Sequence, residues 1–280
     1  MSTTERGAGQ SIVQEHTSSS EHAVLIPTSV GPIGAIVTEP RGEPRCSLVL
    51  LPGAGDVGRS GINASWARAA RAIADRGLTV LRLDYLGTRE SGVGFVYYMS
   101  GGTDDWLALG RRRCREAKLT LRRNLDEVVE WFGARTGKGI ALAASCAGGR
   151  DAARLASRHR RIVGVACFVP ALGSRTPWRG SWRHPSVLLG RRPPEFDFTG
   201  VDREAVREFR RIPRRVPVTL IVGEHDPDDV FILRDRLGAR GVRMAIEVVP
   251  GIALHPFRSP AAQDESVSRL VAWADRLTAT

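Results

Sequence analysis

The chain has 280 residues, 42% of them hydrophobic, which is enough for one large domain or two small ones with a substantial core. No apolar run reaches the roughly 18 residues that span a bilayer, which excludes a membrane-embedded protein. The polar, Ser/Thr-rich start lacks the apolar segment of a signal peptide, so residues 1–22 are expected to form a disordered tail before a domain at 23–280. The sequence predicts a soluble, cytoplasmic protein.

The formal net charge is +11, and 39 of the 41 basic residues are arginine, because Lys118 and Lys138 are the only lysines. Two interpretations stay open: GC-rich coding with a solvated basic surface, or an acidic partner such as an acyl carrier protein or a CoA ester. Nucleic acid is not expected, since no recognition motif occurs. No metal, disulfide or cofactor is expected, because no CxxC pair occurs among the cysteines, Cys46, Cys114, Cys146 and Cys167.

The first predicted element is a hairpin over 23–40 with a Gly-Pro turn. A continuous apolar run at 46–51 predicts a buried strand, which ends at the sequence PGAG. A helix over 64–76 follows and ends before Gly77, a natural C-cap residue. The next strand is expected at 78–83.

Residues 86–118 are Gly-rich and then basic, which predicts a long loop with a short helix. Helices and strands then alternate, which predicts a mostly parallel sheet with helices on both faces. The stretch 171–215 is rich in Pro, Arg and Trp and is expected to form a cap over the carboxyl edge of the sheet, where ligands bind. The other expected elements are helices at 119–136, 148–158, 230–239 and 260–277 and strands at 139–144, 162–168, 217–222 and 243–249.

The sequence KGIALAASCAGGR, residues 138–150, brings a predicted strand into a predicted helix through very small residues. A sharp strand-to-helix turn around Ser or Cys is the nucleophile elbow of hydrolytic enzymes. With Cys146 as nucleophile the pattern is G-x-C-x-G-G with Ala144 at the first position, whereas Ser145 has no glycine two residues away on either side. Cys146 is therefore the preferred candidate and Ser145 the alternative, while a structural turn with a buried cysteine remains a third interpretation.

An acid and a base candidate follow two later strands. Asp226 lies in GEHD just after the strand at 217–222, although Asp228 and Asp229 compete with it and an Asp-Pro turn is the structural alternative. His255, in PGIALHPF, is the base candidate, with a structural loop residue as the alternative. The other histidines are less suitable; His225 cannot easily be oriented by its own neighbour, and His159 lies in a basic surface run.

The chain order of nucleophile, acid and base, each just after a separate strand, is that of α/β-hydrolases. The oxyanion hole would then use the N–H of Ala147, directly after the nucleophile, and a second N–H from the loop after the early strand, at Ala54. Trp178 and Trp182, in the expected cap, either line an acyl pocket or pack the cap onto the body.

Five segments together resemble the α/β-hydrolase superfamily over about residues 24–280, closest to serine-aminopeptidase-like and exosortase-associated hydrolases. The matching pieces are LVLLPGAG, WARAARAIADRGLTVLRLDYLGTRESG, ALAASCAGG, VTLIVGEHD and PGIALHPF. Several members of that lineage carry Cys at the elbow, as dienelactone hydrolases and polyhydroxyalkanoate synthases also do. The chain departs from the family pattern at Pro52-Gly53, which replaces an HG dipeptide, at Ala144, and at the GxGxS segment, which reads Gly87-Thr-Arg-Glu-Ser91.

The resemblance implies a covalent acyl-enzyme on a Cys146–His255–Asp226 triad. Because an S-acyl enzyme is itself a thioester, a Cys nucleophile favours acyl-thioester substrates, as in thioesterases, acyltransferases and cyclases of bacterial secondary metabolism. The alternatives are a carboxylic-ester or lactone hydrolase, a lyase that uses the same pocket, and a non-catalytic protein that keeps the fold.

Overall fold

A computed structural model describes most of the chain, and the described residues are 19–53, 58–85, 91, 103–146, 148–170, 173–177, 196–201, 203–226, 237–239, 241–242, 244–254 and 259–278. Within this set, only the backbone is described for 103–118, 173–177, 196–201 and 203–205.

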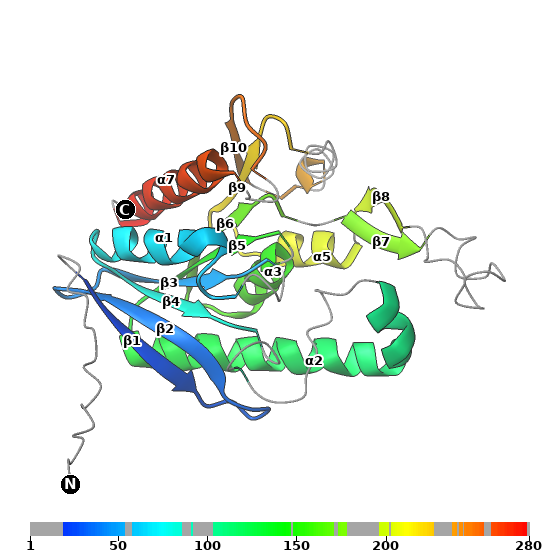
Figure 1. Cartoon of the computed structure of the whole chain (residues 1–280), viewed down its shortest axis with the longest axis horizontal. Coiled ribbons are helices and arrows are strands. Elements are labelled where there is room, and N and C mark those ends of the chain that lie inside the picture. The colour runs from blue at the N-terminus through cyan, green and yellow to red at the C-terminus, as the bar shows by residue number, and fades with distance from the viewer. Residues whose placement is uncertain are drawn as a thin grey trace, which may run out of the picture.

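The centre of the molecule is an eight-stranded sheet with the order β1-β2-β4-β3-β5-β6-β9-β10 (Figure 1). Strands β1 and β4 pair antiparallel with β2, and all other neighbours are parallel. The mostly parallel sheet predicted from the alternating pattern is thus confirmed. The strands are β1 (Ser19–Ile26), β2 (Ile33–Pro40), β3 (Cys46–Leu51), β4 (Leu78–Leu83), β5 (Ile140–Ser145), β6 (Ile162–Phe168), β9 (Val218–Gly223) and β10 (Ala245–Val249).

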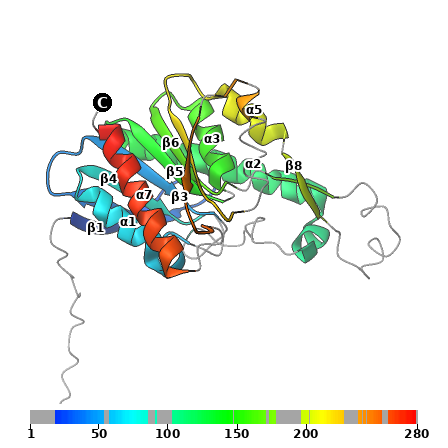
Figure 2. The ribbon, with the colours of Figure 1, turned by 90° about the horizontal axis from the view of Figure 1, so that it is seen from above.

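Helices cover both faces of the sheet (Figures 1 and 2). On one face, α1 (Ser65–Ala74), which follows the short helix η1 (Ile62–Ala64), lies beside α7 (Pro260–Thr278). Apolar side chains of both helices share one core cluster with the sheet. On the other face, α2 (Thr103–Thr136), α3 (Gly148–Arg158) and α5 (Arg203–Arg211) contribute to the second cluster. No helix among the described residues is long and apolar enough to cross a membrane.

The strands around the strand-to-helix turn predicted after residue 144 are buried along their whole length. Every residue of β3, β4, β5 and β9 is buried, which fits the continuous apolar runs expected of parallel strands covered on both sides. Alanines make up much of the buried stripe of α1, so this helix can pack closely on the sheet. The carboxyl ends of the parallel strands therefore form one well-packed edge.

The first strand begins at Ser19, so the tail boundary placed after His22 is four residues too late. Glu21 in β1 forms ion pairs with Arg71 of α1 and with the buried Arg82 of β4, 2.8 and 2.6 Å away. Burial raises the pKa of Glu21, but the hydrogen bond from Arg71 and the charges of both arginines outweigh it and lower the net pKa. The first half of this strand, residues 19–22, is polar and has no apolar pattern, which is why the sequence placed the boundary too late.

The long helix α2 begins at Thr103, so the prediction of a long loop with only a short helix over 86–118 is wrong for 103–118, where the helix is continuous with the one predicted from 119. Figure 1 shows the N-terminal half of α2 running past the strand ends toward β7 (Gly173–Pro177) and β8 (Phe196–Val201). A helical segment that does not lie across the sheet needs no apolar stripe facing it. This explains why its residues lack the pattern that reveals the C-terminal half.

The expected cap, 171–215, divides into two parts. Strands β7 and β8 form a separate antiparallel pair, and their role as a cap remains a prediction. Helix α5 instead belongs to the body, because Val206 and Phe209 are buried in the same cluster as α3. The cap assignment is therefore wrong for this helix. The predicted helix at 230–239 lies mostly outside the described residues.

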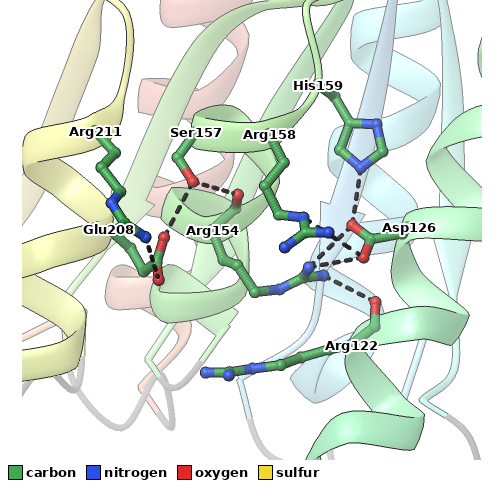
Figure 3. Close-up of polar contacts among 8 residues, drawn as sticks. All are labelled: Arg122, Asp126, Arg154, Ser157, Arg158, His159, Glu208 and Arg211. Atoms are coloured by element: carbon green, nitrogen blue, oxygen red, sulfur yellow. Dashed lines mark hydrogen bonds and ion pairs between the residues drawn. The ribbon is translucent and has the colours of Figure 1, made fainter.

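A polar network joins α2, α3 and the turn after α3 (Figure 3). The buried Arg154 donates to both carboxylate oxygens of Asp126 at 2.9 Å and to the carbonyl of Arg122 at 3.0 Å. His159 Nε2 lies 2.8 Å from Asp126 Oδ1, and its side chain is only 15% exposed. His159 is thus a partly buried partner of Asp126, which corrects its placement in a basic surface run.

Candidate active site at the carboxyl edge

The turn between β5 and α3 contains only Cys146 and residue 147. Cys146 has a φ of 46°, in the left-handed region that side chains with a Cβ rarely adopt. Its N–H donates to the carbonyl of Phe168 at 2.9 Å, and its own carbonyl accepts from the N–H of Gly149 at 3.2 Å. Such a conformation costs about 1–3 kcal/mol and is typical of functional sites. A strained residue between a strand and a helix has the geometry of the nucleophile elbow.

Close backbone contacts explain the glycines around the turn. A Cβ on Gly148 would lie 2.7 Å from the carbonyl oxygen of Pro52 and 2.9 Å from that of Leu51. A Cβ on Gly53 would lie 2.8 Å from the Cβ of Cys146. The loop after β3 and the elbow therefore touch through residues that cannot carry a side chain.

The two nucleophile candidates differ in position. Ser145 is the last residue of β5, pairs in register with Phe168 and is only 5% exposed. Its Oγ lies 3.0 Å from the place where a Cβ on Gly53 would stand, so the hydroxyl packs against that glycine. Cys146 is more exposed and alone of the two has the left-handed backbone. The elbow geometry thus belongs to Cys146.

Asp226 lies in the turn directly after β9 and is 4% exposed. Its Oδ2 accepts a hydrogen bond from the N–H of Gly223 at 2.6 Å, and its own N–H donates back to the Gly223 carbonyl at 3.0 Å. The neighbouring His225 is exposed. Asp226 is therefore a fixed, buried carboxylate at the same sheet edge as Cys146. Strands β5 and β9 are separated only by β6, which places their axes about 10 Å apart.

The segment that leads to His255 packs on the turn of Asp226. A Cβ on Gly223 would overlap the carbonyl oxygen of Ile252 and lie 2.7 Å from the amide nitrogen of Leu254. The N–H of His225 donates to the Ile252 carbonyl at 3.1 Å. The two chain segments are thus adjacent up to the residue before His255.

Five predicted site residues lie outside the described residues. The neighbours of the two predicted oxyanion donors are described, since Gly53 precedes Ala54 and Gly148 follows Ala147. The structure therefore brings Cys146 and Asp226 to one edge, and the catalytic roles of all these residues stay predictions. The residues in question are Ala54, Ala147, Trp178, Trp182 and His255.

Sequence analysis missed one buried acid at this edge. Asp84 follows β4, and its carboxylate accepts from the backbone N–H of Arg59 at 2.6 Å and pairs with the Arg59 guanidinium. The signal was present in the sequence, because an aspartate directly after a buried strand is the same feature that singled out Asp226. The pairing itself joins residues 25 positions apart and is visible only in the fold.

No protein-family model matches the sequence, and a search of curated proteins finds no match either. Several solved structures are similar in fold. A dienelactone hydrolase from Anabaena variabilis ATCC 29413 has 17% identity and a TM-score of 0.62, over 91% of this chain and 97% of that one. An esterase from Pyrobaculum calidifontis has 19% identity and a TM-score of 0.60, over 93% and 86% of the two chains.

An α/β hydrolase from Penicillium sp. sh18 has 15% identity and a TM-score of 0.65, over 93% of this chain and all (100%) of that one. These likenesses extend over nearly the whole length of both partners, which agrees with the strand order and the helices on both faces. At such low identity they concern the fold alone, and the narrower lineage suggested by the sequence remains a prediction. The chain has the α/β-hydrolase fold.

Proposed function

We propose that the protein cleaves carboxylic esters or lactones with activated leaving groups through a covalent acyl-enzyme on Cys146. The observation that carries this proposal is the left-handed backbone of Cys146 between β5 and α3. The structural neighbours named as a dienelactone hydrolase and an esterase favour esters and lactones over the acyl-thioesters preferred from sequence.

The proposed reaction begins when the Cys146 thiolate attacks the substrate carbonyl carbon. His255 takes the thiol proton, and the buried Asp226 orients His255 and stabilises its charged form. The negative charge that forms on the carbonyl oxygen is stabilised by the N–H of Ala147 and that of Ala54. The C–O bond to the leaving group then breaks, His255 gives its proton to the departing oxygen, and water hydrolyses the S-acyl enzyme with His255 as base.

The nucleophile restricts the substrate. A thiolate is a better leaving group than an alkoxide, so the tetrahedral intermediate on Cys146 returns to substrate unless the departing oxygen is a good leaving group or receives a proton from His255. Phenolic esters, enol esters and strained lactones meet the first condition, whereas simple alkyl esters depend wholly on the second. We therefore expect activity to depend steeply on the pKa of the leaving group.

Acyl-thioesters are the second candidate substrates. Transfer from a carrier or CoA thioester to Cys146 exchanges one thioester for another and is close to isoenergetic. Release by water, an amine or an internal hydroxyl would then define a thioesterase, an acyltransferase or a cyclase. The net charge of +11 favours an acidic carrier or CoA, since both are anionic.

The test is a substrate panel with matched variants. Wild-type protein, Cys146→Ala, Cys146→Ser and Ser145→Ala are assayed with a p-nitrophenyl ester, an enol lactone, an ethyl ester and an acyl-CoA. Intact mass after brief incubation detects the acyl-enzyme, and peptide mapping after iodoacetamide locates the reactive thiol. The proposal expects turnover of the first two substrates, loss in Cys146→Ala, and an adduct on Cys146.

Three results would contradict the proposal in different ways. Full activity in Cys146→Ala with none in Ser145→Ala would move the nucleophile to Ser145. Preference for acyl-CoA over the activated esters would support the second candidate. Elimination without an acyl-enzyme would indicate a lyase, and no turnover of any substrate would favour a non-catalytic protein.

A further inference from the structure

Eight exposed arginines gather around the amino ends of β6 and β9, at the sheet edge opposite the candidate active site. They belong to two segments: the end of α3 with the turn before β6, and α5 with the loop before β9. Because β6 and β9 pair in parallel, the residues that precede them meet at one edge. We call this set the arginine surface: Arg158, Arg160, Arg161, Arg207, Arg210, Arg211, Arg214 and Arg215.

Direct contacts join the two segments. Arg215 donates from its guanidinium to the carbonyl of Arg160 at 3.2 Å. The hydroxyl of Ser157 in α3 donates to the carboxylate of Glu208 in α5 at 3.1 Å (Figure 3). Helices α3 and α5 also lie side by side on the same face of the sheet (Figures 1 and 2). The body of the protein therefore presents these arginines as one continuous surface.

Most of these arginines have no acidic partner. Arg158 and Arg211 each lie near one carboxylate, 3.8 Å from Asp126 and 3.9 Å from Glu208. Both acids already accept hydrogen bonds from other groups, Asp126 from Arg154 and Glu208 from the α3 serine. The other six arginines form no ion pair with any residue whose side chain the structure describes. Their positive charge is left for a partner outside the chain.

Arginines on the opposite face of the sheet have acidic partners instead. All four arginines of α1 and α7 form ion pairs: Arg68 with Asp264, Arg71 with Glu21, Arg269 with Glu265 and Arg276 with Glu247. A bias toward arginine codons alone would leave paired and unpaired arginines mixed over both faces. Placement at a helix C-terminus is favourable for Arg210 and Arg211, at the end of α5, but it does not explain the arginines of the two loops.

The composition of the arginine surface discriminates between anionic partners. No Phe, Trp or Tyr side chain is exposed in the described part of the chain, so no described ring can stack on a base or anchor at a lipid interface. Protein interfaces are enriched in arginine and depleted in lysine, and the planar guanidinium binds a carboxylate through two hydrogen bonds. Val163, which is 40% exposed, and the exposed Pro217 lie at the starts of the two strands and add apolar contact area.

We infer that the arginine surface is a docking site for a protein that presents clustered Asp and Glu side chains. This inference goes beyond the proposed function. The N–H of Cys146 contacts the carbonyl of Phe168, the last residue of β6, and the arginines precede Ile162, its first residue. At about 3.3 Å per residue, the arginine surface lies about 20 Å from the level of Cys146. A docked partner therefore leaves the candidate active site open.

The experiment measures binding of fluorescein-labelled decaglutamate at about 0.1 M ionic strength, where exposed charges more than about 10 Å apart are screened. In Arg160→Glu/Arg214→Glu, which reverses two unpaired arginines of the surface, we expect Kd to rise at least about tenfold, because like charges across an interface repel. Arg68→Glu/Arg269→Glu is the matched control, since it changes the net charge equally on the opposite face. Its Kd should stay within about twofold of wild type.

The comparison probes are single-stranded decathymidylate and vesicles of phosphatidylcholine with phosphatidylserine, and both should bind more weakly than decaglutamate. Thermal unfolding confirms that each variant is folded. If the charge reversal prevents folding, Arg160→Gln/Arg214→Gln is compared with Arg68→Gln/Arg269→Gln, and only the first pair should raise Kd, by at least about threefold.

Equal weakening in both double variants would overturn the inference, because the net charge alone would then explain binding. Tighter binding of decathymidylate or of the vesicles would also overturn it, in favour of a nucleic acid or a membrane, as would the absence of decaglutamate binding to wild-type protein. Ester turnover should be the same in both double variants as in wild type, so these outcomes are independent of the proposed function.

Discussion

The left-handed backbone of Cys146 leads to a stability test that needs no substrate. A residue with a Cβ in this conformation costs about 1–2 kcal/mol, which glycine does not incur. Glycine also loses more freedom on folding, which offsets about 0.4–1 kcal/mol of that gain. Cys146→Gly should therefore be more stable than Cys146→Ala by about 0.5–1 kcal/mol. The comparison of Gly with Ala removes the contribution of the thiol itself.

Ser145 is the internal control, because it precedes Cys146 and is absent from the described residues with positive φ. In an extended strand glycine is less stable than alanine by about 0.5–1 kcal/mol. The step from Ala to Gly should thus stabilise the protein at position 146 and destabilise it at position 145. Urea unfolding of Cys146→Ala, Cys146→Gly, Ser145→Ala and Ser145→Gly measures both steps. The Tm difference between the Ala and Gly variants should be about 1–4 °C and of opposite sign at the two positions.

The result that would refute the reasoning is a Cys146→Gly variant no more stable than Cys146→Ala. It would mean that position 146 carries no conformational strain, and the elbow assignment would lose its main support. Both Cys146 variants should be inactive on esters.

Three further outcomes follow from the structure. Gly148→Ala, which forces a Cβ against two backbone carbonyls, should cost about 1–3 kcal/mol and lower kcat at least tenfold, whereas Gly42→Ala, with open space around it, should change neither. Burial raises the pKa of Asp126, but hydrogen bonds from His159 and Arg154 outweigh it and lower the net pKa. The ionised Asp126 carboxylate therefore stabilises the folded protein at neutral pH, and this contribution is lost as pH falls through the lowered pKa. Asp126→Asn should accordingly be about 3 kcal/mol less stable at pH 7 and closer to wild type below about pH 4, by urea titration. Burial raises the pKa of Cys167 to about 12, so iodoacetamide should leave this thiol unlabelled in folded protein at pH 8.

The sequence predicted the parts of the site that depend on local patterns. The elbow could be found because β5, the small residues and α3 are consecutive in the chain, and each has a distinct composition. Asp226 could be found because it ends an apolar run. The choice of Cys146 over Ser145 followed from glycine spacing and stays a prediction, whereas the contacts of Gly148 with the end of β3 give the physical reason for a glycine at that position.

Features that depend on distant partners were not predictable in the same way. The polar first half of β1 is held by ion pairs of Glu21 with Arg71 and Arg82, which no local pattern reveals. The N-terminal half of α2 lacks an apolar stripe because it lies past the strand ends. The Arg59–Asp84 pair joins two loops that meet only when β3 and β4 pair.

The candidate site obtains its rigidity from the ends of strands. Arg59, ahead of η1, is held by Asp84 at the end of β4, and the turn after β9 is closed by the carboxylate of Asp226 on Gly223. Both anchors are buried acids at the carboxyl edge, on either side of the Cys146 elbow. Both carboxylates accept backbone hydrogen bonds, so the proposed mechanism would rely on groups that the strand ends hold in place.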